Sequence, residues 1–222
     1  MSKTFSIDLF NKMPIVGILR NVPSQYMAAI AENYHQSGLT CLEITMNSPN
    51  AEQDIAALTG QFGEELNVGA GTVCTLNDLE KALKANAQFI VTPIVNDDVI
   101  KACVDAGVPV IPGAYTPTEI YKAWSLGATM VKVFPATKLG AGYIKEVLGP
   151  LGHLKLIPTG GIDFGNFTDY LDAGAKGVGL GSHLFLKNII ENKDWKTLSE
   201  VFSSFAVKFT AHQNGKAKIA AS

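Results

Sequence analysis

Short apolar runs rich in β-branched residues recur along the chain, and each is followed by a longer stretch with helical spacing. Their average spacing of about 23 residues suits a strand, a turn, a helix and a second turn. Nearly every position within a run is apolar, which is typical of parallel strands that are buried on both faces. The runs are Ile15–Arg20, Cys41–Met46, Asn67–Thr72, Phe89–Pro93, Pro109–Ala114, Met130–Pro135, Leu154–Gly161 and Gly177–Leu184.

The stretches between the runs carry helix start signals. Thr75 and Asn96 precede acidic residues, and Thr116 is followed by a proline and, three positions on, by Glu119. Eight strand–helix units in 222 residues predict an α/β fold, a single (β/α)8 TIM barrel, because five or six units would favour an open doubly wound sheet. We expect one domain over residues 1–222, with a C-terminal helix and a short frayed tail from about residue 189.

Composition and charge narrow the class of protein. Apolar residues make up 47% of the chain, and the net charge of −2 gives no basic surface for nucleic acid or an anionic membrane. No apolar stretch approaches the roughly 20 residues of a membrane span, and the first residues lack the features of a secretory signal. Three cysteines without CxxC spacing predict reduced thiols. We therefore expect a soluble, cytoplasmic protein with no metal site.

Lys132 is the most informative candidate for chemistry, since barrel active sites lie at the carboxyl ends of the strands. It stands among apolar residues in MVKVFP. Burial lowers the pKa of an amine, and a neutral amine attacks a carbonyl carbon to form a Schiff base. The alternative is an ion-paired lysine, or one whose ammonium group reaches solvent at the rim of the strand.

Glu43, in CLEITM, is expected to point into the same barrel mouth. A desolvated carboxylate gains basicity and can move protons near neutral pH. A structural ion pair with the lysine is the alternative interpretation.

Further residues at strand ends are candidates for binding the anionic groups of a substrate. Arg20 and Asn47 are candidate carboxylate ligands, because a guanidinium group matches a carboxylate with two hydrogen bonds; a solvated surface arginine is the alternative for Arg20. Thr159-Gly160-Gly161 and the pair Gly181-Ser182 end the seventh and eighth runs. Loops at those places commonly bind phosphate through backbone N–H groups, although tight turns use glycines too.

Seven motifs that follow one another along the chain resemble those of the 2-dehydro-3-deoxy-6-phosphogluconate aldolase and 4-hydroxy-2-oxoglutarate aldolase family. The members of this family are class I aldolases. The resemblance covers about residues 15–184 and implies a (β/α)8 barrel. The motifs are LEIT (42–45), VGAGTV (68–73), VTP (91–93), IPGAYTPTE (111–119), VKVFPA (131–136), PTGGI (158–162) and GLGS (179–182).

The resemblance implies roles for these residues. Lys132 aligns with the Schiff-base lysine and Glu43 with the general acid and base. Thr72, Pro93 and Phe134 align with the pyruvate end of the site, where Thr72 would hold the carboxylate. The residues that align with the phosphate site are Gly160, Gly161, Gly181 and Ser182. The implied reaction cleaves 2-dehydro-3-deoxy-6-phosphogluconate to pyruvate and glyceraldehyde 3-phosphate in a homotrimeric enzyme that needs no metal or cofactor.

The chain departs from the family pattern after the second run. Some members carry a carboxylate-binding arginine where this chain has Asn47, whereas the related phosphogalactonate aldolases place the arginine at the position of Arg20. Thr159 instead matches the phosphogluconate type, and its hydroxyl would help to select the C4 epimer. A phosphogalactonate aldolase, a phosphate-binding barrel isomerase and a non-catalytic scaffold are the alternatives. Activity on 4-hydroxy-2-oxoglutarate is a further expectation.

Overall fold

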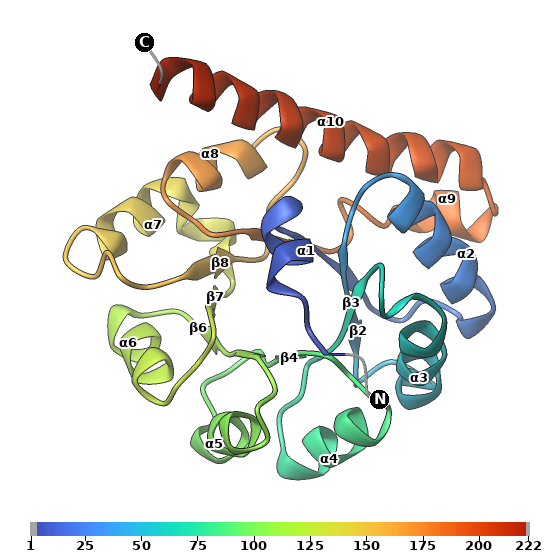
Figure 1. The fold of residues 1–222 in the computed structure, drawn as a ribbon, viewed down its shortest axis with the longest axis horizontal. Helices are drawn as coiled ribbons and strands as arrows, with labels where there is room; N and C mark the ends of the chain where they lie inside the picture. Colours follow the sequence, from blue (N-terminus) through green and yellow to red (C-terminus); the bar gives the residue numbers. More distant parts are fainter. Residues whose placement is uncertain (1–3, 221–222) are drawn as a thin grey trace.

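The computed structural model describes residues 4–220 as parallel strands that alternate with helices (Figure 1). The strands are β1 (Ile15–Leu19), β2 (Cys41–Thr45), β3 (Asn67–Gly71), β4 (Ile90–Val91), β5 (Val110–Ile111), β6 (Gly113–Ala114), β7 (Val131–Val133), β8 (Leu156–Pro158) and β9 (Val178–Leu180). The helices are α1 (Ile7–Lys12), α2 (Ser24–Gln36), α3 (Ala51–Phe62), α4 (Leu76–Lys84), α5 (Asp97–Asp105), α6 (Pro117–Ser125), the 3-10 turn η1 (Ala136–Lys138), α7 (Gly140–Leu148), α8 (Phe167–Asp172), α9 (Lys187–Glu191) and α10 (Trp195–Ala220).

The strands form a curled parallel sheet in two hydrogen-bonded sections. One section has the order β5-β4-β3-β2-β1-β9 and the other β6-β7-β8. The fifth predicted strand is split at Pro112, which has no N–H to donate, although its carbonyl accepts a bond of 2.8 Å from Lys132 N–H. An isolated bridge between Thr159 and Gly179 joins the end of β8 to β9. The chain is therefore an α/β fold with a curled parallel sheet, and every predicted run contains a strand.

Two layers of apolar side chains stabilise this arrangement. The outer layer lies between the sheet and the surrounding helices α2 to α8 (Figure 1), and α10 packs on the outside against α2. The inner layer fills the space enclosed by the strands, and Phe10 of α1 contributes to it. This inner cluster consists of Phe10, Val16, Cys41, Phe89, Val91, Ile111, Met130 and Ile157.

Helix α1 lies across the end of the sheet at which the strands begin. Thr40 donates a hydrogen bond of 2.8 Å to the carbonyl of Leu9, and Ser6 N–H donates one of 2.7 Å to Asn67 Oδ1. Thr40 precedes β2 and Asn67 opens β3, so these bonds place α1 over the amino ends of the strands. The carboxyl ends remain open for a site.

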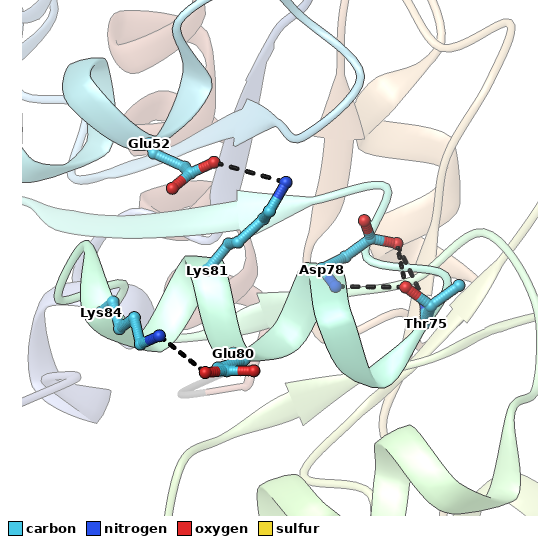
Figure 2. Close-up of polar contacts among 6 residues, drawn as sticks. All are labelled: Glu52, Thr75, Asp78, Glu80, Lys81 and Lys84. Atoms are coloured by element: carbon cyan, nitrogen blue, oxygen red, sulfur yellow. Dashed lines mark hydrogen bonds and ion pairs between the residues drawn. The ribbon is translucent and has the colours of Figure 1, made fainter.

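The predicted helix starts are confirmed at the side-chain level. Figure 2 shows the reciprocal capping box of α4, in which Thr75 and Asp78 satisfy each other's backbone N–H groups. Thr116 and Glu119 form the same box at α6. Lys81 of α4 pairs with Glu52 of α3 at 3.7 Å (Figure 2), although exposed pairs of this kind contribute about 0–1 kcal/mol.

The C-terminal region forms α9 and then α10, which continues to Ala220. Residues 221–222, the end of the tail that we expected to be frayed, lie outside the described residues. Within residues 4–220, none of the helices combines the length and the apolar character that crossing a membrane requires.

One buried hydroxyl ties α2 to the sheet. Tyr34 is 0% exposed, accepts a hydrogen bond of 3.1 Å from Gly17 N–H in β1, and donates one of 2.9 Å to the Cys41 carbonyl in β2. The hydroxyl thus serves two adjacent strands from a helix.

We predict that Tyr34→Phe lowers the free energy of unfolding by about 1–3 kcal/mol, because buried backbone groups lose their partner. Urea denaturation measures the change. The control is Tyr121→Phe, at a side chain 50% exposed, which should change stability by less than about 0.5 kcal/mol. Equal stabilities of the two variants would contradict the prediction.

Candidate active site

A cavity of about 600 Å³ opens at the carboxyl ends of the strands. Most of its wall comes from the loops after β1, β7, β8 and β9 and from α9. Among the residues that line the cavity are Arg20, Asn21, Phe134, Thr159, Gly160, Gly161, Gly181, Ser182, His183 and Lys187.

Lys132 lies at the middle of β7, between the fully buried Val131 and Val133, and is 5% exposed. Its Nζ atom is 5.1 Å from the centre of the Phe134 ring. Burial lowers the pKa of the Lys132 amine below the ordinary lysine value; the charge of Glu43 opposes the shift and that of Arg20 reinforces it. A lowered pKa enlarges the neutral, nucleophilic fraction of the amine at a given pH.

Glu43 lies in β2 and is 1% exposed. Its side chain lies directly over Gly71, since a Cβ at that position would come within 1.7 Å of Glu43 Oε1. Oε1 has no hydrogen-bond partner among the described residues. Burial raises the pKa of the Glu43 carboxyl above its ordinary value, although the charges of Lys132 and Arg20 oppose the shift. A buried carboxylate oxygen without a partner is costly and marks a functional position.

The two groups border one small cavity of about 10 Å³, which Thr159 also lines. They form no ion pair within 4.0 Å in the part of the chain that the structure describes. The structural ion pair that was the alternative interpretation is therefore not formed here. The arrangement offers an amine with a lowered pKa and a carboxyl with a raised pKa to the same small space, which suits nucleophilic and proton-transfer chemistry.

Arg20 and Thr72 directly follow β1 and β3, the two strands that flank β2 in the sheet. Arg20 Nη2 donates a hydrogen bond of 3.4 Å to Thr72 Oγ1. Thr72 has φ 56°, a left-handed conformation that a β-branched residue rarely adopts. Such strain is concentrated at functional sites. Thr72 is the one hydrogen-bond partner of the exposed Arg20 guanidinium group among residues 4–220, and the remaining N–H groups suit a carboxylate.

The glycine loops after β8 and β9 form the other end of the cavity. The N–H groups of Gly160, Gly161 and Ser182 donate no hydrogen bond to another described residue, whereas the Gly161 carbonyl accepts one of 3.0 Å from Asn166 Nδ2. Gly160 and Gly161 have φ 97° and 71°. Free backbone N–H groups on a glycine-rich loop suit an anion such as phosphate.

Three predicted site residues, Asn47, Thr72 and Pro93, are not among the residues that line these cavities, although Thr72 accepts the hydrogen bond from Arg20. Asn47 is exposed, and Pro93 lies beside Gly113, away from the cavity wall. Their roles stay predictions. Conversely, His183 and Lys187 line the large cavity and were missed. Only their nearness to the Gly181-Ser182 pair could have indicated them, because α9 is too short to give a periodic pattern.

Comparisons with known proteins agree with this geometry. The family model described as KDPG and KHG aldolase matches residues 7–201; KDPG stands for 2-dehydro-3-deoxy-6-phosphogluconate and KHG for 4-hydroxy-2-oxoglutarate. A 2-dehydro-3-deoxy-6-phosphogalactonate (KDPGal) aldolase of Escherichia coli is 34% identical over 175 residues, 78% of this chain and 85% of that protein. A 2-dehydro-3-deoxy-phosphogluconate aldolase of Haemophilus influenzae is 32% identical over 197 residues, 88% and 92% of the two chains.

Solved structures give the same result. A native KDPGal structure superposes with a TM-score of 0.86 at 29% identity, covering 95% of this chain and 99% of the other. A KDPG aldolase of Legionella pneumophila, with pyruvate captured as a covalent carbinolamine intermediate, has a TM-score of 0.83 at 27% identity, covering 89% and 96%. This chain therefore belongs to the KDPG and KHG aldolase family, whose members are carbon–carbon lyases.

Proposed function

We propose that this chain is a Schiff-base aldolase that reversibly cleaves KDPG to pyruvate and glyceraldehyde 3-phosphate. The observation that carries the proposal is Lys132, an amine 5% exposed in an apolar strand, which borders one small cavity together with Glu43. Relatives that bear this activity in their names support it.

The proposed architecture is a closed (β/α)8 barrel formed by one domain over residues 1–222. Two connections between the sheet sections support closure, namely the shared strand around Pro112 and the bridge from Thr159 to Gly179. A homotrimeric assembly and a cytoplasmic location stay predictions.

The first chemical step is addition of the neutral Lys132 amine to the C2 carbonyl carbon. The carbonyl oxygen leaves as water, and an iminium ion remains on Nζ. Its positive charge withdraws electrons from the bonds next to C3. The lowered pKa of Lys132 favours this step, because only the unprotonated amine has a free electron pair.

The second step breaks the C3–C4 bond. Glu43 takes the proton of the C4 hydroxyl, so that a carbonyl forms at C4 and the bonding electron pair moves to the iminium to give an enamine. Glyceraldehyde 3-phosphate leaves, C3 takes up a proton, and water hydrolyses the new iminium to pyruvate and free Lys132. The raised pKa of Glu43 makes its carboxylate a stronger base than an ordinary glutamate.

Two anionic ends of the substrate match two ends of the site. Arg20 and Thr72 would hold the carboxylate, with Phe134, Asn47 and Pro93 as the other predicted contacts. The loops with Gly160, Gly161, Gly181 and Ser182 would hold the phosphate through backbone N–H groups. KHG, which has no phosphate group, is a second substrate and would give pyruvate and glyoxylate.

KDPGal is the alternative main substrate, and a relative that is 34% identical carries that name. The position of Arg20 also fits that type. We favour the gluconate epimer because the side chain of Thr159, 5% exposed, lines both cavities. A phosphate-binding barrel isomerase would use the glycine loops but would give no role to Lys132.

Trapping with sodium borohydride tests the proposal. Incubation with pyruvate and borohydride should add the mass of one reduced pyruvate to the wild-type chain, since borohydride reduces the iminium to a stable amine. Lys132→Ala should gain no mass, and Lys145→Ala, a control at another lysine, should be labelled. Intact-mass spectrometry reads the result; an unlabelled, folded wild type would refute the aldolase mechanism and favour the isomerase.

Glu43→Gln should separate the two steps. We expect cleavage of KDPG to fall by about 10²–10⁴-fold, because the amide cannot take the C4 proton, while pyruvate is still trapped on Lys132. Stopped-flow or coupled detection of pyruvate measures the first quantity and mass spectrometry the second. Retention of more than a tenth of wild-type cleavage would show that another group moves the proton.

Thr159→Val should change the choice of epimer. Loss of the hydroxyl should lower kcat/KM for KDPG relative to KDPGal by about 10-fold or more, since valine cannot make a hydrogen bond to a substrate hydroxyl. Parallel assays with the two purified epimers measure the ratio. An unchanged ratio would remove Thr159 as the determinant.

A further inference from the structure

A buried pair of hydroxyls, one at the last residue of β2 and one in the turn after it, holds the turn that follows β1. Asn21 N–H donates a hydrogen bond of 2.8 Å to Ser48 Oγ, and this oxygen lies 2.9 Å from Thr45 Oγ1. Ser48 is 7% exposed and Thr45 0% exposed. Ser48 N–H also donates a bond of 2.9 Å to the Thr45 carbonyl, which fixes the serine on its own turn. The position of Ser48 Oγ is therefore set by β2 and not by solvent.

Asn21 depends on this contact because of its backbone conformation. Its φ of 54° is left-handed, a region that only glycine adopts freely and that asparagine tolerates better than most residues. Without an acceptor for its N–H, the Asn21 backbone would be free to relax to a negative φ. That rotation would carry the preceding residue, Arg20, away from its present direction.

Arg20 affects both the large cavity and the two catalytic groups. It lines the large cavity, and its Nη2 atom bonds Thr72 at 3.4 Å. Its charge also acts on the pKa values of Glu43 and Lys132. A displaced Arg20 would therefore weaken binding of the carboxylate without removing the nucleophile.

We propose that Ser48, paired with Thr45, is a positioning residue that fixes Arg20 at the carboxylate end of the cavity by holding Asn21 in its left-handed conformation. The inference rests on the proposed function, in which Arg20 binds the carboxylate of pyruvate. Ser48 acts only through the backbone of the turn. Within the segment Asn47-Ser48-Pro49, the side chain that accepts a hydrogen bond from that turn is Ser48.

The test measures the pyruvate concentration that gives half-maximal borohydride trapping on Lys132. Ser48→Ala should raise this concentration by about 10-fold, while saturating pyruvate still labels the whole sample, which shows that the variant is folded. Arg20→Ala should raise it at least as much. The double variant should equal Arg20→Ala alone, because no guanidinium group remains to be positioned.

Two further variants separate positioning from general stability. Thr40→Val removes another buried hydroxyl, which donates a bond of 2.8 Å to the Leu9 carbonyl at the opposite end of the sheet, and should leave the half-maximal concentration unchanged. Asn21→Gly should reduce the effect of Ser48→Ala to less than about 3-fold, since glycine adopts the left-handed conformation without steric cost.

A wild-type value for Ser48→Ala, or effects of Ser48→Ala and Arg20→Ala that multiply, would overturn the inference while the aldolase mechanism stands. Absence of trapping in the wild type would overturn the proposed function and the inference together. The two failures are therefore distinguishable in one set of measurements.

Discussion

The burial of a carboxyl group and an amine in the same apolar interior is the constraint on which the site depends. Glu43 and Lys132 are 1% and 5% exposed, so each loses most of its hydration. Desolvation disfavours the charged form of both groups and moves their pKa values toward each other, while their mutual attraction restores only part of the loss. Glu43 is therefore a weaker acid, and Lys132 a weaker base, than the same side chains on a protein surface. Reversible imine and proton-transfer chemistry requires both properties.

The fold offsets the cost of burying these two groups by placing stabilising apolar contacts at the amino ends of the strands and the site toward their carboxyl ends. At the amino ends, α1 covers the interior, and Phe10 joins an apolar cluster with neighbouring strands. At the carboxyl ends, the same strands give way to loops with free N–H groups and left-handed residues. Most of the buried apolar residues lie in the layer between the sheet and the outer helices, so the interior can tolerate one unpartnered carboxylate oxygen.

Much of this organisation could be predicted from the sequence. The buried, unalternating strands and the capping boxes at Thr75 and Thr116 have local signatures, and Lys132 and Glu43 stand out because charged residues are rare in such strands. The split of the fifth strand at Pro112 was not predicted, since the run around it looks continuous.

Contacts between loops could not be read from the sequence either. Asn47 is a candidate from its place at the end of the second run, yet the side chain that bonds to the turn after β1 is Ser48. Serine is common in turns and gives no signal by itself. His183 and Lys187 line the cavity from the loop after β9 and from the first residue of α9. In each case the missing information is the path of a loop, which depends on packing between segments distant in sequence.

The pKa of Lys132 in the free protein shows whether burial makes this amine a nucleophile. Protein with ¹³C-labelled lysine side chains can be titrated by NMR, and the Lys132 signal is assigned by its absence from Lys132→Ala. We expect a pKa below the ordinary lysine value of about 10.4, and a still lower one in Glu43→Gln, because removal of the negative charge leaves desolvation unopposed. A pKa at or above the ordinary value would refute the role of Lys132 as nucleophile, since the amine would then be an ordinary protonated lysine.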